Sequence, residues 1–352
     1  MLHSDVIFDA ERMKYPFSGL NTYCAALANS LNNIETPNKL SIQYYVPKKA
    51  MRFLGNKASY IIQNSLHKFY NPYNKHCRIW HCTFQGTSYF PFGSSCKIVL
   101  TIHDLNFLHE NISPAKVAKN KKALQLKIDA SDAITTISYF VKKEIEENFS
   151  LHNKTIQVIY NGCNIPEHIT TTQPSLPTNE PFLFSIGMIH HKKNFHVLPR
   201  LLLNNKYHLI IAGFCQDKSY QQKIVEEAKK LNVQDRVHII GAVTESEKYW
   251  LYQNCEAFCF PSIAEGFGLP VVEAMYFGKP LILSTHTCLP EIGGNLARYF
   301  KTFDIEDMQT ALTEALSDRT NLTLIEQLKF RALNFNWDEL AKVYYQVYIS
   351  LL

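Results

Sequence analysis

The sequence lacks several features that would each have assigned it to a particular class of protein. No apolar run among its 352 residues approaches the roughly 18 that a membrane-spanning helix requires. An acidic residue, Asp5, stands too close to the first residue for a signal peptide. Nine cysteines are present but none has CxxC spacing, so we expect free thiols rather than a disulfide framework or a zinc site. These absences predict a globular cytoplasmic protein.

Acidic residues are also absent between Glu35 and Asp104, where nine lysines and arginines occur. Residues 1–165 hold 19 basic and 11 acidic residues, a net charge of +8, whereas residues 166–352 hold 17 and 20, a net charge of −3. Such asymmetry is typical of contact with an anionic partner, such as a membrane surface, a lipid phosphate or nucleic acid. The alternative is a merely basic surface. No nucleic-acid-binding motif is recognisable, so no nucleic acid is expected.

Short β-rich apolar runs alternate with helical patterns, which predicts βα units with parallel strands. The expected strands are 6–8, 42–46, 79–81, 97–101, 133–137, 155–159, 182–186, 208–212, 237–240, 257–260 and 281–283. The expected helices include 21–31, 139–148, 219–231, 270–277, 306–317 and 337–352. The proline- and threonine-rich stretch 166–181 predicts a linker. We therefore expect two doubly wound α/β domains, residues 1–165 and 182–336, which bind ligands beyond the carboxyl ends of their strands.

One segment late in the chain carries the clearest chemical signal. Gly266 and Gly268 precede Pro270, which suits the first residue of a helix. Free amides at a helix N-terminus bind anions, and glycines allow a ligand to approach the backbone. Glu265 and Glu273 stand eight residues apart, so their carboxylates can accept hydrogen bonds from hydroxyl groups at two parts of one extended ligand. The alternative is a glycine turn with two solvated carboxylates.

The run from Glu265 to Glu273 matches the E-G-F-G-L-P-x-x-E signature and resembles the retaining GT-B glycosyltransferases similar to family 4, the glycosyl transferases group 1 class. The resemblance implies two Rossmann-like domains facing across a cleft, with a C-terminal helix at 337–352 that crosses back to the N-terminal domain. It implies that a nucleotide-sugar donor binds the second domain and an acceptor binds the first. The donor contacts that it assigns to this segment are Glu265, Gly266, Phe267, Gly268, Leu269 and Glu273.

A second segment, Ser185–Asn194, resembles the family loop G-R/T-x-x-P-R-K-N, whose basic residues neutralise the donor diphosphate. Lys193 matches the family lysine, and Lys192 matches the arginine before it. Met188 stands where the family has a further arginine, so one diphosphate contact is missing or is replaced by a histidine or by Lys192. Lysine can still supply a point charge to phosphate, without the bidentate fork of arginine.

Three further segments carry weaker parts of the resemblance. Gly19 lies in a segment that resembles the glycine-rich G-G-I-G-R-Y loop, trimmed to one glycine, which approaches the donor phosphate or the acceptor. Gly241 and Val243 lie in a segment that resembles the G-x-V loop, whose backbone meets the nucleotide base. His103 and Asp104 resemble the family's V-H-D, in which the histidine faces the transferred sugar; Asp104 is expected to cap the next turn or to orient the imidazole.

An apolar stripe in the acid-free segment predicts a surface helix over 59–70. Ile62, Leu66, Phe69 and Tyr70 fall on one helical face, and lysines surround them. Such a helix suits weak contact with an anionic membrane surface. The alternative is that the stripe packs on the sheet.

The resemblance implies a retaining glycosyltransferase that moves a sugar from a nucleotide-diphosphate sugar, GDP-mannose-like or UDP-linked. The implied acceptor is a glycan or a lipid-linked glycan in cell-surface polysaccharide assembly, such as that of lipopolysaccharide. The expected catalytic residues are His103, Glu265 and Lys193. No D-x-D motif follows a strand, so we expect no metal and no other cofactor. The alternatives are a sugar-nucleotide epimerase or hydrolase on the same fold, or a non-catalytic nucleotide-sugar-binding protein. The expected location is the cytoplasm, peripheral to the inner membrane.

Overall fold

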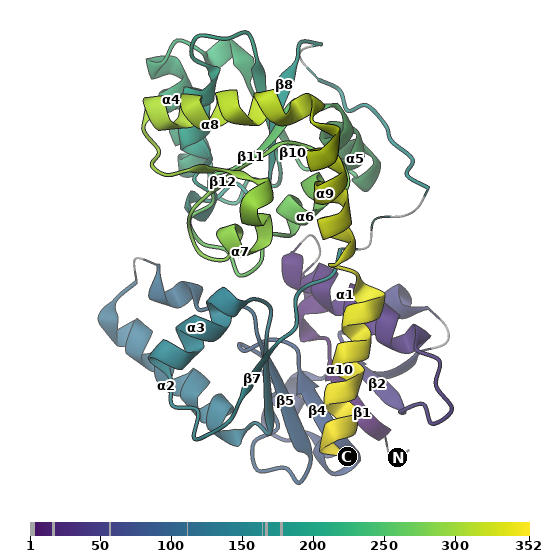
Figure 1. Ribbon diagram of the computed structural model, residues 1–352. Helices are drawn as coiled ribbons and strands as arrows, with labels where there is room; N and C mark the ends of the chain where they lie inside the picture. The colour runs from purple at the N-terminus through teal and green to yellow at the C-terminus, as the bar shows by residue number, and fades with distance from the viewer. Residues whose placement is uncertain are drawn as a thin grey trace. The chain divides into compact units, whose positions relative to one another are not determined.

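The computed structural model describes residues 4–15, 18–55, 58–110, 112–163, 165, 168–176 and 179–352. By its contacts the chain divides into two compact units, Met1–Asn164 with Phe335–Leu352, and Ile165–Asn334. Each unit contains one parallel β-sheet with helices packed against it (Figure 1). The α/β class predicted from the alternating pattern is therefore confirmed.

The sheet of the first unit has seven strands in the order β3-β2-β1-β4-β5-β6-β7. They are β1 (Ser4–Asp9), β2 (Ile42–Val46), β3 (Ser59–Ile62), β4 (Cys77–Cys82), β5 (Lys97–Ile102), β6 (Ala133–Thr136) and β7 (Ile156–Val158). All neighbouring pairs are parallel. The strand order reverses between β1 and β4, and the carboxyl edge at such a switch point is where doubly wound sheets bind ligands.

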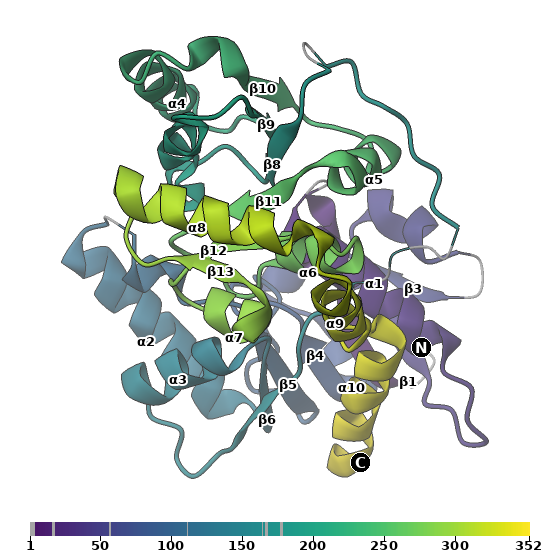
Figure 2. The same cartoon turned by 45° about the horizontal axis from the view of Figure 1, so that its top comes forward.

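The helices of the first unit are α1 (Gly19–Asn33), α2 (Pro114–Ala130), α3 (Tyr139–Asn148) and α10 (Trp337–Leu351). Although the whole second unit precedes it in the sequence, α10 lies beside α1 (Figures 1 and 2). The hydroxyl groups of Tyr344 and Tyr23 lie 2.9 Å apart, and the Tyr348 hydroxyl lies 2.7 Å from His81 Nδ1 on β4. These buried contacts anchor the C-terminal helix to the core of this unit.

The helix predicted over 59–70 is wrong. Residues 59–62 form β3, which pairs with β2 and buries Ile61, and a short 3-10 turn follows at Ser65–Lys68. The edge of β2 offers unpaired backbone groups, and their hydrogen bonds outweigh the helical spacing of the apolar side chains. The stripe does not pack on the sheet either, because Ile62, Leu66, Phe69 and Tyr70 are 44%, 69%, 91% and 72% exposed.

The sheet of the second unit has six parallel strands in the order β10-β9-β8-β11-β12-β13. They are β8 (Phe182–Ile186), β9 (His208–Ala212), β10 (Val237–Gly241), β11 (Ala257–Phe260), β12 (Leu281–Ser284) and β13 (Arg298–Phe300). The helices are α4 (Lys218–Lys230), α5 (Glu245–Asn254), α6 (Leu269–Tyr276), α7 (Leu289–Gly293), α8 (Ile305–Ser317) and α9 (Leu322–Leu333). Strand β13 is not among the predicted strands, because it has only three residues and an exposed arginine at its start.

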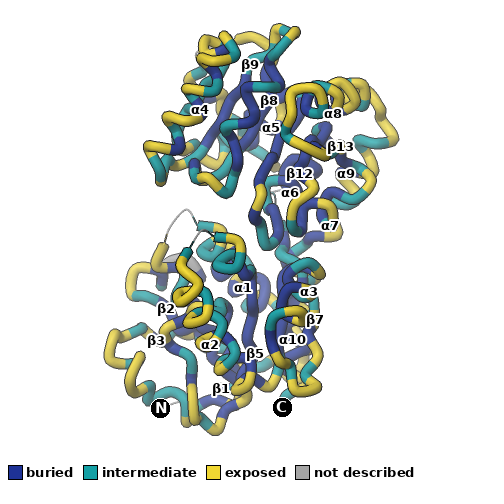
Figure 3. The backbone as a smooth tube through the Cα atoms, turned by 90° about the vertical axis from the view of Figure 1, so that its left-hand side faces the viewer, coloured by how far each residue is buried: buried dark blue, intermediate teal, exposed yellow. Residues whose placement is uncertain are grey.

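The central strands of both sheets are buried, as Figure 3 shows by the dark strands inside each unit, whereas the edge strands β3, β7, β10 and β13 are less buried. Parallel strands covered on both faces are apolar along their whole length, which is why the strand signal in the sequence is strong. All nine cysteines are free thiols. Within the described ranges no helix is long and apolar enough to cross a membrane.

Candidate functional site

Lys193 and Glu265 form an ion pair in the second unit, between the loops that follow β8 and β11. Lys193 Nζ lies 2.5 Å from Glu265 Oε1, and the two side chains are 18% and 13% exposed. The Ser262 hydroxyl lies 2.6 Å from the same carboxylate oxygen, and the ammonium group lies 4.9 Å from the centre of the Phe260 ring. An unpaired charge at this depth would be costly, so each side chain holds the other in place. Two of the predicted catalytic residues are thus in direct contact.

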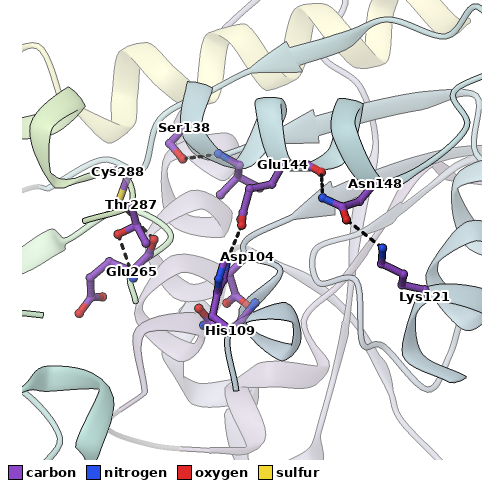
Figure 4. A network of polar contacts seen from close by, with 11 residues as sticks. Asp104, His109, Lys121, Ser138, Glu144, Asn148, Glu265, Thr287 and Cys288 are labelled. Carbon is purple, nitrogen blue, oxygen red and sulfur yellow. Dashed lines mark hydrogen bonds and ion pairs between the residues drawn. The ribbon is translucent and has the colours of Figure 1, made fainter. Parts of the chain in front are cut away.

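Backbone contacts hold the three loops of this region together. Ile263 N–H donates to the Lys192 carbonyl at 2.9 Å, which ties the β11 loop to the β8 loop. Glu265 N–H donates to Thr287 Oγ1 at 3.2 Å, and the Cys288 thiol donates to the Glu265 carbonyl at 3.4 Å (Figure 4). Glu265 is therefore held by its backbone as well as by its carboxylate, so its position does not depend on one contact.

Three glycines form a ladder at the carboxyl edges of β8, β9 and β10. Gly187 N–H donates to the Ala212 carbonyl at 3.0 Å, and Gly213 N–H donates to the Gly241 carbonyl at 2.6 Å. All three glycines have positive φ, and a Cβ on Gly213 would lie 1.9 Å from the Gly187 carbonyl oxygen. A Cβ on Gly241 would meet nothing within 4 Å, so this backbone is open to a ligand. The ladder brings the predicted diphosphate and base loops side by side.

Helix α6 begins at Leu269, one residue before the start that Pro270 predicts, and Gly268 caps it with φ of 93°. The amides of the first turn have no partner within the helix, so they and the positive end of the helix dipole suit a phosphate oxygen. A Cβ on Gly268 would lie 2.9 Å from Leu289 Cδ2, so that side chain would have to shift, and the φ of 93° is itself strained for other residues. Phe267 is buried beside it, whereas Gly266 is partly exposed.

Glu273 lies on α6 and is 8% exposed. Lys248 Nζ donates to its Oε1 at 2.6 Å, and the Tyr252 hydroxyl donates to its Oε2 at 2.8 Å. Each carboxylate oxygen keeps a second lone pair, so the group can also accept hydrogen bonds from a pair of hydroxyl groups. Both partners come from α5, which follows the loop that holds Gly241 and Val243.

His103 follows β5 in the first unit and is buried. Its Nε2 lies 2.8 Å from the Thr83 carbonyl, and its ring packs edge-on against Tyr23 at 4.5 Å. Burial lowers the pKa of His103 to about 4, so the imidazole is neutral at pH 7 and donates from Nε2. By contrast, burial raises the pKa of Asp9, at the end of β1, to about 7.

The first unit holds further predicted and unpredicted groups at the segment after β5 and at the start of α1. Asp104 Oδ1 accepts the Asn106 amide at 3.1 Å, so Asp104 caps the following turn, as one of the two expected roles requires. His109 pairs with the buried carboxylate of Glu144 on α3, and burial raises the pKa of Glu144 (Figure 4). Gly19 is the first residue of α1, where a Cβ would meet nothing within 4 Å. Pro16 and Phe17 of its predicted loop lie outside the described residues.

The structure thus places the predicted residues in two groups. Lys192, Lys193 and residues 265–273, with the loop of Gly241 and Val243, line the carboxyl edge of the second sheet, whereas His103 and Gly19 belong to the first unit. Two residues of the second unit were missed by the sequence patterns. Gly213 directly follows the expected strand 208–212, so its place at a strand end could have indicated a role in ligand binding. Lys248 lies in a polar helix, and no motif in the sequence distinguishes it from other lysines.

Comparisons with known proteins match both parts of the chain. A family model described as "Glycosyl transferases group 1" matches residues 169–331, and one described as "Glycosyltransferase Family 4" matches residues 41–166. O-antigen chain mannosyltransferase RfbU of Salmonella typhimurium is 27% identical over 215 residues, which are 60% of this chain and 59% of that protein. O-antigen chain mannosyltransferase B of Escherichia coli is 23% identical over 349 residues, 89% of this chain and 91% of that protein. The match to serotype-specific mannosyltransferase WbdA of Escherichia coli covers 64% of this chain but 29% of that protein.

Solved structures show the same fold. Sucrose-phosphate synthase of Thermosynechococcus elongatus superposes with a TM-score of 0.79 and 17% identity, over 99% of both chains. HepE of Anabaena, solved with UDP and glucose, superposes with a TM-score of 0.77 and 16% identity, over 99% of this chain and 100% of that one. The fold is therefore that of the GT-B glycosyltransferases, and the chain belongs to the family 4-like glycosyltransferases of the glycosyl transferases group 1 class.

Proposed function

We propose that this glycosyltransferase moves a sugar, with retention of anomeric configuration, from a nucleotide-diphosphate sugar to a glycan or lipid-linked acceptor in cell-surface polysaccharide assembly. The observation that carries the donor assignment is the Lys193–Glu265 pair beside the α6 N-terminus, because it sets a cation, a carboxylate and free amides at one sheet edge. The similarity to O-antigen mannosyltransferases supports a role in polysaccharide assembly. These relatives favour a GDP-mannose-like donor, whereas the UDP bound in HepE would favour a UDP-sugar.

In the proposed mechanism the donor diphosphate lies against Lys192, Lys193 and the first amides of α6. These groups stabilise the negative charge that develops on the leaving nucleoside diphosphate, without a metal ion. Glu265 and the amides of Gly266 to Gly268 hold hydroxyl groups of the donor sugar. Glu273 holds the ribose, and the backbone at Gly241 and Val243 meets the base.

Retention follows from attack on the same face from which the leaving group departs. The acceptor oxygen bonds to the anomeric carbon while the bond from that carbon to the diphosphate oxygen breaks. The acceptor proton passes to a phosphate oxygen of the leaving group, so no protein base is required. His103, neutral at pH 7, is proposed to contact the transferred sugar by hydrogen bonding rather than by charge.

A binding panel tests the donor assignment. We expect GDP or UDP, with the matching sugar nucleotide, to raise the melting temperature of the wild-type protein, because a ligand that binds only the folded state stabilises it. The shift should persist in EDTA and should fall by more than half in Glu273→Gln, which loses the ribose carboxylate. An EDTA-sensitive shift would contradict metal independence. If no nucleotide changed the melting temperature, the donor assignment would be wrong.

Product analysis separates the two alternatives from transfer. An epimerase or hydrolase would convert the donor without an acceptor, and a binding protein would leave it unchanged. With a lipid-linked acceptor present, the proposal requires a glycosylated product whose new linkage has the anomeric configuration of the donor.

We further propose that the first unit contacts an anionic membrane surface through four exposed apolar side chains of one short segment, Ile62, Leu66, Phe69 and Tyr70, which we call the apolar patch. The patch lies in the segment without acidic residues, beside Lys68 and Lys75. Exposed aromatic and aliphatic side chains with basic neighbours suit the interface of an anionic bilayer. This contact would bring the enzyme to a lipid-linked acceptor.

Vesicle sedimentation tests the membrane contact. The double variant Phe69→Ser, Tyr70→Ser is expected to bind phosphatidylglycerol vesicles with about 10-fold lower affinity. It removes two aromatic side chains that would enter the interface of the bilayer. Phe330→Ser on α9 is the matched control, since Phe330 is also 70% exposed but lies in the second unit. Equal loss in both variants, or binding that does not weaken in high salt, would contradict the proposal.

A further inference from the structure

We propose that Lys248 is a positioning residue, which holds the Glu273 carboxylate in the orientation that ribose binding requires. The proposal rests on the proposed function, since it assumes that Glu273 binds the ribose. It adds a residue that no part of the sequence resemblance assigns.

The Lys248 ammonium group lies between two carboxylates in a largely buried place. Its side chain is 13% exposed, and Nζ lies 2.6 Å from Glu273 Oε1 and 2.9 Å from Glu245 Oε2. Burial by itself lowers the pKa of Lys248, but the attraction of Glu273 and Glu245 overcomes it and raises this pKa above its ordinary value. The lysine is therefore a permanent cation at the site.

The contacts fix the direction of the Glu273 carboxylate. Lys248 holds one oxygen and the Tyr252 hydroxyl holds the other, so the group cannot turn without losing a charged hydrogen bond. A buried ion pair contributes little net stability compared with apolar packing, so stability alone does not explain a lysine here. Orientation of a ligand-binding group does.

Lys248 also connects the two segments that meet the nucleoside in the proposed function. Its backbone N–H donates at 2.9 Å to the carbonyl of Thr244, the cap of α5, which directly follows Val243. Its side chain reaches α6 through Glu273. The lysine side chain thus links the first turn of the helix that follows the base loop to the ribose carboxylate.

Calorimetry on single and double variants tests this role, with GDP and UDP as probes and inorganic pyrophosphate as the probe that lacks a ribose. Lys248→Met is expected to weaken binding of the nucleoside diphosphate about 10-fold, the loss of one charge-assisted hydrogen bond. Pyrophosphate affinity should not change. Lys248→Arg should restore most of the affinity. Glu245→Gln is the control, because the Glu245 side chain is 72% exposed.

The double variant Lys248→Met, Glu273→Gln decides whether Lys248 acts through Glu273. We expect it to bind the nucleotide as Glu273→Gln alone does. The inference would be overturned if the losses of nucleotide affinity in the two single variants added up in the double variant, or if Lys248→Met bound the nucleotide as the wild type does. An equal loss of pyrophosphate affinity in Lys248→Met would also overturn it. Each of these results would leave the proposed function intact. Absence of nucleotide binding by the wild-type protein would overturn both. If Lys248→Met does not fold, the double variant is compared with Glu273→Gln, because both lack the Glu273 carboxylate and so leave no unpaired charge there. Equal nucleotide affinity in these two variants shows that Lys248 acts through Glu273.

Discussion

Replacement of Lys193 with methionine is expected to lower the rate of sugar transfer by about 10²–10³-fold, the loss typical of one group that stabilises charge in a transition state. The ammonium group is the cation nearest Glu265 in the described loops after β8 and β11, and it is proposed to face the departing diphosphate. Methionine keeps the length of the side chain and removes its charge. The effect should fall on kcat more than on KM, because the charge on the leaving group develops as the bond breaks.

A matched control comes from the same unit. Lys279 is also partly buried, and its Nζ donates to the Cys255 carbonyl at 3.0 Å, away from the proposed donor contacts. Lys279→Met removes a comparable contact and should leave kcat within about twofold, since it touches none of the proposed donor contacts. Steady-state kinetics with the donor identified by the binding panel make the comparison. A Lys193→Met enzyme that keeps wild-type kcat would exclude Lys193 from catalysis.

Gly213→Ala is expected to lower the free energy of unfolding by at least about 3 kcal/mol and to abolish nucleotide binding. The new Cβ would lie 1.9 Å from the Gly187 carbonyl oxygen, and this neighbour is backbone that cannot rotate away. The β8 loop that holds Lys193 would have to move, and the φ of 140° is itself strained for alanine. Urea denaturation and calorimetry with the nucleotide measure the two effects.

Gly241→Ala separates the effect of backbone strain from the effect of the steric clash between a Cβ at position 213 and Gly187. Gly241 also has a positive φ, 75°, but a Cβ there meets nothing within 4 Å. Alanine should therefore lower the free energy of unfolding by only about 1 kcal/mol, the cost of a left-handed conformation. Similar losses in both variants would show that strain alone explains them and that the close approach of the two loops is unimportant.

The sequence by itself determined the α/β class, most strands and the family. Strands such as 182–186 and 257–260 match the structure because buried parallel strands are apolar at every position, which leaves a strong local signal. The signature from Glu265 to Glu273 is local as well, since one loop and the first turn of one helix supply it. Such features need no knowledge of distant residues.

Only the tertiary structure decided which residues act together. Local spacing favoured a helix at 59–70, but the free edge of β2 pairs with this segment, and that edge lies elsewhere in the chain. The contacts of Lys193 with Glu265, of Gly213 with Gly187, and of Lys248 with Glu273 join segments between 25 and 72 residues apart. A parallel sheet brings the ends of distant strands to one edge, and no local pattern encodes which side chains meet there.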